Sequence, residues 1–178
     1  MEKIEDKIYP NFAECERLWQ KHNTPSHVIG HCKEVSRVAV LLAKHLQTKG
    51  ILLNIPLLQS AGWLHDIKRA EEEHWEKGAQ IAHDLGFDDL ANVIFQHMSH
   101  RIEGPKKDIT ELDILCLADR MVLEDKFVGL DLRMDYIIKK SQDDKTAEER
   151  IRKSFSQTAL FLQQVEDLIG TKICEIMK

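Results

Sequence analysis

Apolar residues recur along this chain at the spacing of three and four residues that is typical of amphipathic helices. A clear example is the stripe formed by Val28, Val35, Val38 and Leu42. Alternation with a period of two and clusters of β-branched residues, which mark strands, are missing. The pattern therefore predicts an all-α fold.

Capping and turn residues indicate where these helices begin and end. The expected N-caps are Thr24, Asn54, Thr110 and the capping-box residue Thr146. The expected helices cover about 11–21, 24–49, 54–65, 71–85, 88–97, 110–122, 130–140 and 146–170, with a polar turn at 141–145. No repeat or linker interrupts them, so we expect one domain over residues 1–178, with its motifs at about 24–125 and further helices at about 130–170.

The composition is that of a globular chain with a hydrophobic core. Of the 178 residues, 43% are hydrophobic and 31% are charged, and the formal net charge is −5. This charge gives no basic surface, so we expect no duplex nucleic acid partner. Residues Met1–Asp6 are charged, unlike a signal peptide, and no apolar run approaches the ~20 residues that span a bilayer, so we expect no membrane partner.

The four cysteines are widely separated and form no Cys-x-x-Cys pair, so neither a zinc knuckle nor a redox motif is predicted. They are Cys15, Cys32, Cys116 and Cys174. We expect buried, reduced thiols and a cytoplasmic location. The sequence leaves association into a homo-oligomer open.

His65 and Asp66 form the most informative pair in the chain. They adjoin each other at the end of an apolar segment, next to Leu64 and Ile67. An imidazole and a carboxylate are costly to bury there unless something pairs with them. A divalent cation would be such a partner.

Other residues on the inward faces of expected helices could bind the same cation. Asp119 stands where leucine would fit the apolar pattern, and a lone carboxylate on a core face is rare. His31 and His97 also follow apolar stripes, where a single histidine is more often a hydrogen-bonded core residue than a ligand. A cation shared by His31, Asp119 and the His65–Asp66 pair explains these residues together.

The ligand types favour a catalytic site over a structural one. Nitrogen and carboxylate oxygen without thiolate suit Mn²⁺, Fe²⁺, Co²⁺, Ni²⁺ or Zn²⁺. Neighbouring helical residues point about 100° apart, so His65 and Asp66 share an ion only near a helix end, or Asp66 bridges two ions. Because His74 and His97 are available to a second ion, we expect one or two divalent ions per chain.

Taken together, the spaced motifs resemble the HDIG subgroup of the HD superfamily of metal-dependent phosphohydrolases. The matching segments are His31-x3-Val35-x3-Ala39, Leu64-His65-Asp66-Ile67, His74-x3-Gly78-Ala79, Val93-Ile94-x2-His97 and Leu117-Ala118-Asp119-Arg120. The resemblance implies a helical bundle and a first metal site made by His31, His65, Asp66 and Asp119. Members with two metals add histidines that match His74 and His97, with the Asp66 carboxylate between the ions.

Basic residues near the expected ligands are candidates for binding phosphate. Lys68 and Arg69 follow the His65–Asp66 pair directly, and Arg101 lies four residues past His97. Each of them is also explained as a solvated surface cation. Arg69 is the preferred catalytic and substrate-binding residue, because it matches the basic position that closes the HDIG motif and arginine can bind phosphate through two parallel hydrogen bonds.

These residues support a metal-dependent phosphohydrolase that uses metal-activated water to cleave a phosphoester or phosphoanhydride bond of a nucleotide or other small phosphorylated compound. A second hypothesis is a di-iron oxygenase, since some proteins of the resembled fold hold two irons through four histidines and two aspartates. A third is a sensor that binds a nucleotide without turning it over, although a pure binder has no need of an open metal site. The basic residues favour hydrolysis.

Overall fold

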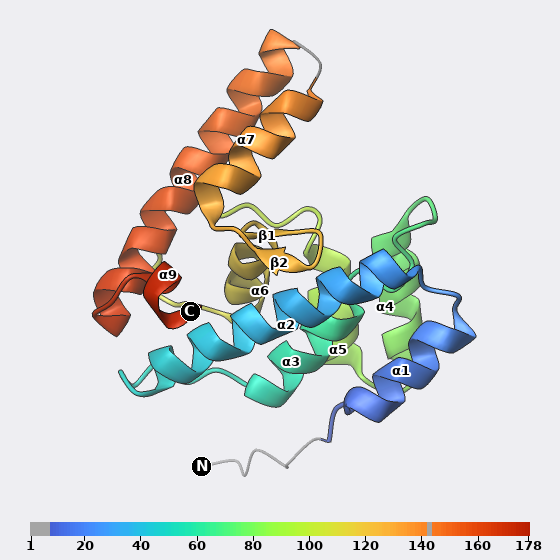
Figure 1. Cartoon of the computed structure of the whole chain (residues 1–178). Coiled ribbons are helices and arrows are strands. Elements are labelled where there is room, and N and C mark those ends of the chain that lie inside the picture. The colour runs from blue at the N-terminus through green and yellow to red at the C-terminus, as the bar shows by residue number, and fades with distance from the viewer. Residues whose placement is uncertain (1–7, 142–143) are drawn as a thin grey trace.

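The computed structural model describes residues 8–141 and 144–178, and these ranges are mostly helical (Figure 1). The helices are α1 (Phe12–Lys21), α2 (Ser26–Gln47), α3 (Ile55–Leu64), α4 (His74–Asp84), α5 (Asp88–Gln96), α6 (Glu111–Asp119), α7 (Leu130–Lys140), α8 (Lys145–Ile169) and α9 (Ile173–Ile176). The predicted all-α fold is confirmed. The charged segment 1–6 and residues 142–143 of the expected polar turn lie outside the described residues.

Local capping chemistry sets the starts of α3 and α6 where the sequence predicted them. The side chain of Asn54 accepts a hydrogen bond from the Leu57 amide, and a proline follows within the first turn of α3. Thr110 and Asp113 form a reciprocal capping box at the start of α6. Both helices therefore begin at residues whose side chains satisfy free backbone amides.

Two predicted N-caps are wrong by one or two residues. Pro25 is the N-cap of α2, while the Thr24 hydroxyl donates instead to the carbonyl oxygen of Ile67 at 2.8 Å. Asp144 caps α8 by accepting from the Ala147 amide at 3.0 Å, in place of the threonine two residues later. In the first case a long-range contact replaces a local one, and in the second a nearer carboxylate competes for the same role.

The predicted start of α4 at residue 71 is also wrong. The helix begins at His74, after Glu73 in the left-handed region with φ 53°. Glu71 lies in the preceding turn, where its carboxylate pairs with Lys68 at 2.5 Å and with Lys77 at 3.0 Å. The turn between α3 and α4 is therefore longer than the helical spacing of the sequence indicated.

A small β-hairpin contradicts the expectation that the chain has no strands. Strand β1 (Val122–Leu123) pairs antiparallel with β2 (Lys126–Phe127) directly after α6. Strands of two residues are too short for any alternation to be visible in the sequence. The Phe127 amide donates to the carboxylate of Glu34 on α2 at 3.1 Å, which fixes the hairpin against that helix.

Helix α2 lies at the centre of the packing and contacts α3, α6 and the hairpin, while α4 packs against α5. Helices α2 and α3 cross closely at Gly62. A Cβ added to this glycine would lie only 2.5 Å from the Cα of Ser36. Helices α7 and α8 lie side by side and extend away from these helices as a long hairpin (Figure 1). The structure thus places one helical hairpin beside the packed helices that carry the predicted ligands.

The prediction of buried thiols is confirmed for three of the four cysteines, namely Cys15, Cys32 and Cys116, which are buried and free. It is wrong for Cys174, which is exposed on the short helix α9. Among the described helices, none is both long enough and apolar enough to cross a membrane.

Candidate metal centre

His65 and Asp66 lie just past the end of α3. The helix ends at Leu64, so His65 is its C-cap and Asp66 belongs to the following turn. Both side chains are buried, with residue exposures of 1% and 6%. Because continuous α-helical hydrogen bonding stops here and turns follow, two neighbouring residues near the helix end can point into one site, as expected from the sequence.

The other predicted ligands converge on this pair from four different helices. Helix α2 supplies His31 from its interior, and α4 supplies His74 from its first position. His97 is the C-cap of α5, and Asp119 is the last residue of α6. Helix ends therefore deliver most of the site.

The first cluster consists of His31, His65 and Asp119. Nε2 of His31 lies 2.9 Å from Oδ1 of Asp119, and Nε2 of His65 lies 4.0 Å from the same oxygen. The candidate ligand atoms all lie within 4.8 Å of one another. Three donors at such separations could hold one divalent cation.

The second cluster consists of Asp66, His74 and His97, all of them buried. Oδ1 of Asp66 lies 3.2 Å from Nε2 of His74 and 3.5 Å from Nε2 of His97. Oδ2 of the same carboxylate lies 3.8 Å from Nε2 of His65, which belongs to the first cluster. Asp66 therefore stands between the clusters and presents one oxygen to each.

Backbone carbonyl oxygens orient three of the four histidine rings. In each pair, Nδ1 of the ring is within hydrogen-bond distance of a carbonyl oxygen, which only accepts. The pairs are His31 with Glu124 (3.0 Å), His65 with Gly62 (2.9 Å) and His97 with Ile94 (2.5 Å). Each Nδ1 therefore carries the hydrogen, and in the neutral ring Nε2 keeps its lone pair for the centre of the site.

The polar atoms at the centre fit a bound cation. Among the described residues, Nε2 of His65, Oδ1 of Asp66 and Nε2 of His97 are buried without a hydrogen-bond partner. Such groups are costly to bury alone. The lone pairs of His31 Nε2 and Asp119 Oδ1, 2.9 Å apart, would also repel unless a proton or a cation lay between them.

Burial and the neighbouring charged groups shift the pKa values of His65, Asp66 and Asp119. Burial lowers the pKa of His65 to about 4, so its ring is neutral at pH 7. Burial opposes ionisation of Asp119, but the hydrogen bond to His31 and the nearby rings lower its pKa to about 2. Burial likewise opposes ionisation of Asp66, yet the surrounding histidines hold its pKa well below the usual value. The site therefore combines two carboxylates with a neutral imidazole, which suits a divalent cation.

Comparison with known proteins agrees with this geometry. A model of the HD domain family matches residues 28–122, which carry all six residues of the two clusters. The chain belongs to the HD domain family. HD domains bind divalent metals and are generally metal-dependent phosphohydrolases.

The chain is also similar to an uncharacterized protein of Methanocaldococcus jannaschii. The two are 34% identical over 127 residues, which cover 62% of this chain and 75% of the relative. No solved structure matches the chain. The comparisons therefore establish the family and leave the reaction to be inferred from the site.

The two histidine–aspartate clusters open into a cavity of about 870 Å³. Its walls include metal-site residues from both clusters, the first turns of α2, the turn of the hairpin, and α7. Arg69, the predicted phosphate-binding residue, lines the cavity. Its Nη1 lies 3.0 Å from Nε2 of His74, and its Nε lies 3.7 Å from Oδ2 of Asp66. This guanidinium is thus beside the site and close to half exposed.

The structure does not bring Lys68 and Arg101 to this cavity, as far as the described residues show. The Lys68 ammonium points to Glu71 and lines a separate small hollow with residues of the α1–α2 turn. Arg101 is exposed in the segment after α5. For these two residues the alternative interpretation as surface cations agrees better with their positions.

Several residues at the site were missed by the sequence analysis. Arg133, Tyr136 and Lys140 on α7 line the cavity, and the hairpin residue Glu124 supplies the carbonyl oxygen that faces His31. The spacing of the α7 residues would have shown that they share one helix face. That this face meets the cavity depends on how the C-terminal helices pack, which no local pattern indicates.

A buried ion-pair network beside the site was also missed. The fully buried carboxylate of Asp113 lies 2.6 Å from Nε2 of His100 and 2.5 Å from Nζ of Lys106. Arg120, the C-cap of α6, donates to the Thr158 hydroxyl and to the His100 carbonyl oxygen. His100 therefore belongs to a structural network, not to the metal-ligand set.

Proposed function

We propose that this protein is a phosphohydrolase that uses two divalent ions to cleave a phosphoester or phosphoanhydride bond in a nucleotide or another small phosphorylated compound. The observation that carries the proposal is the position of Asp66. One of its carboxylate oxygens faces each histidine cluster, and Oδ1 has no hydrogen-bond partner among the described residues. In this proposal His31, His65 and Asp119 would hold one ion and His74 and His97 the other, and Asp66 would serve as a ligand shared by the two clusters.

Divalent ions in such a site lower the pKa of water and neutralise charge on a phosphoryl group. The protein contributes the orientation of the ligands, because carbonyl oxygens fix three of the histidine rings. Arg69 contributes a half-exposed cation beside the site, and its planar guanidinium can bind two phosphoryl oxygens at once. A guanidinium that now contacts His74 and Asp66 would turn toward the substrate when metal ions occupy the site.

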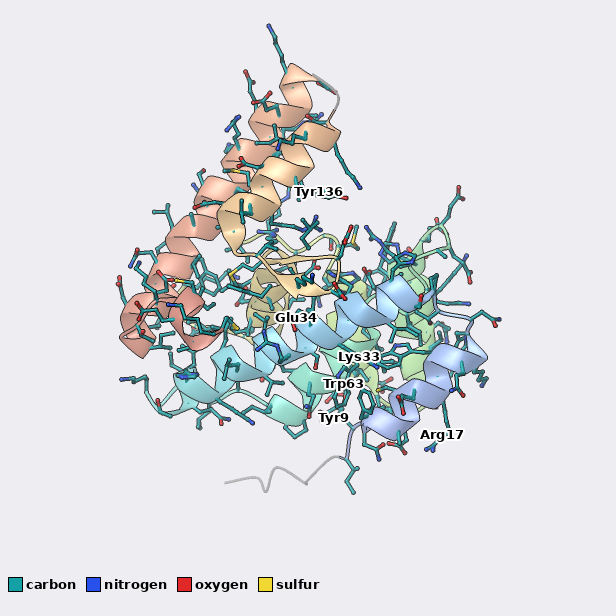
Figure 2. The ribbon with its side chains drawn as sticks, viewed as in Figure 1. Tyr9, Arg17, Lys33, Glu34, Trp63 and Tyr136 are labelled. Atoms are coloured by element: carbon teal, nitrogen blue, oxygen red, sulfur yellow. The ribbon has the colours of Figure 1, made fainter. Side chains whose placement is uncertain are left out.

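Arg69→Ala provides the test. We expect phosphate release from a cleaved nucleotide to fall by about 10²–10³, the usual effect of losing one charge-assisted contact in the transition state. Metal content should not fall, because the substitution removes a positive charge from the ligands. Arg17→Ala is the matched control, since Arg17 is an exposed arginine on α1, outside the cavity (Figure 2).

The assay should screen nucleotides and other phosphorylated compounds without oxygen and with Mn²⁺ or Co²⁺ as the metal. Persistent phosphate release under these conditions supports hydrolysis. Strict dependence on iron and dioxygen, with no phosphate released from any compound, would contradict the proposal and favour the oxygenase hypothesis.

A further inference from the structure

One face of α7 forms part of the cavity wall. The face begins with Arg133 and continues three, four and seven residues later with Tyr136, Ile137 and Lys140. All four side chains line the cavity, together with His31, Asp66 and Asp119. Figure 2 shows Tyr136 projecting from α7, and the helix lies beyond the segment 28–122 that the family model matches. This wall is therefore a feature of the chain that the family match does not cover.

Arg133 and Lys140, the two cations on this wall, form no ion pair among the residues that the structure describes. Two other arginines on helices pair with carboxylates of their own helix, Arg37 with Glu34 and Arg152 with Glu148. Within the described part of the chain, neither Arg133 nor Lys140 has a carboxylate within ion-pair distance. Among the described residues the two cations therefore have no direct carboxylate partner, and the acids Glu124 and Asp125 line the same cavity without pairing with them.

Arg133 carries a second, independent sign of a missing partner. Its Nε is buried and has no hydrogen-bond partner among the described residues. A buried N–H without an acceptor is costly, and such groups are uncommon in folded proteins. The described residues therefore leave part of the hydrogen-bonding capacity of this guanidinium on the cavity wall unfilled.

Tyr136 holds the two cations in place. Nζ of Lys140 lies 4.5 Å from the centroid of the tyrosine ring, and Cζ of Arg133 lies 5.7 Å from it. Both distances are within the range of cation–π attraction, which leaves the N–H donors free while limiting the movement of the side chains. The ring therefore preorganises two positive charges on one side of the cavity.

We propose that Arg133 and Lys140 form a second anion subsite, and that the substrate is a compound with two separated phosphate groups. One phosphate lies at the histidine–aspartate clusters, where cleavage takes place, and the other is bound by the cations of α7. A cavity of about 870 Å³ is large enough for such a compound and much larger than a single phosphate ion requires. This inference rests on the proposed function for the identity of the first group.

The test compares two probes that differ by one phosphate, adenosine 3′,5′-bisphosphate and adenosine 5′-monophosphate. Their binding to the metal-loaded protein is measured by calorimetry, with metal content checked afterwards. For Arg133→Gln/Lys140→Gln we expect the bisphosphate to bind about 10- to 100-fold more weakly, because charge-assisted hydrogen bonds are lost. Binding of the monophosphate should change by less than about threefold, since its one phosphate lies at the clusters.

The matched control is Lys139→Gln/Lys153→Gln, which removes two exposed positive charges from α7 and α8 outside the cavity. It should leave the affinity for both probes unchanged. If the double variant of the wall is unstable, Lys140→Gln alone carries the test, because that side chain is exposed near the end of α7. Equal affinity of wild type and variant for the bisphosphate would overturn the subsite.

The two proposals fail in different ways. If no compound releases phosphate but bisphosphate binding depends on Arg133 and Lys140, the proposed reaction is wrong and the subsite stands. If phosphate is released but neither KM nor bisphosphate affinity responds to the two substitutions, the reaction stands and the subsite is wrong.

Discussion

At the scale of single residues, Asp66 links the two clusters because its two oxygens face different histidines. The sequence predicted all six clustered residues, since each is a polar residue in an apolar or family-specific position. It could not predict which cations reach the cavity. Lys68 and Arg69 are neighbours in sequence, yet only Arg69 lines the cavity, because a turn directs the two side chains to different places.

Asp113 gives a prediction about acid stability that is separate from the metal site. Burial alone would raise its pKa, but His100, Lys106 and the Thr110 cap together lower it well below the usual value. A carboxylate with a lowered pKa stabilises the fold above its unfolded pKa of about 4 and loses that contribution as pH falls further.

We therefore expect Asp113→Asn to lower the free energy of unfolding by about 3–5 kcal/mol at pH 7, because it leaves His100 and Lys106 near a neutral group in the core. The difference from wild type should shrink steadily below about pH 4, because the unfolded carboxylate takes up a proton there while the native carboxylate, with its lowered pKa, stays ionised. Urea unfolding at a series of pH values measures this. A difference that stays constant down to pH 2 would show that the charge of Asp113 contributes nothing.

At the scale of elements, the site depends on where helices end. Local capping residues predicted the starts of α3 and α6, because a side chain and an amide three residues apart decide them. The start of α4 and the β-hairpin could not be predicted in this way. The start of α4 depends on a long turn after Asp66. The hairpin depends on a hydrogen bond between Phe127 and Glu34, which are far apart in sequence.

Gly62 lets α3 approach α2 closely enough for His65 to reach the site. In Gly62→Ala the new Cβ would meet the Ser36 backbone at 2.5 Å, and backbone atoms move less readily than side chains. We expect a loss of about 1–3 kcal/mol in the free energy of unfolding, as for other overpacked cores, together with weaker metal binding.

Gly78→Ala is the matched control for this prediction, since it is also a glycine within a helix. Its Cβ would meet a methyl group of Ile94 at 3.1 Å, which can give way more easily. We expect its stability to stay within about 1 kcal/mol of wild type, because alanine also favours the helix. Equal stability of the two variants in urea unfolding would argue that the α2–α3 crossing does not constrain the site.

At the scale of the whole molecule, the packed helices hold the clusters, and α7 and α8 extend from them as a hairpin (Figure 1). Residues of α7 form one wall of the cavity. Links such as the hydrogen bond from Arg120 on the C-cap of α6 to Thr158 on α8 join the two parts. Helical spacing predicted α7 and α8 as elements but gave no information on where they pack. That the chain forms one domain stays a prediction.

The most direct test of the whole account is the number of metal ions per chain. Elemental analysis of the protein after loading with Mn²⁺ or Co²⁺ and removal of free metal should give close to two ions for wild type and close to one for His97→Ala. His83→Ala, which alters an exposed histidine paired with Asp88 outside the site, should match wild type. A single ion per chain that is unaffected by His97→Ala would contradict the two-ion site on which the proposed function depends.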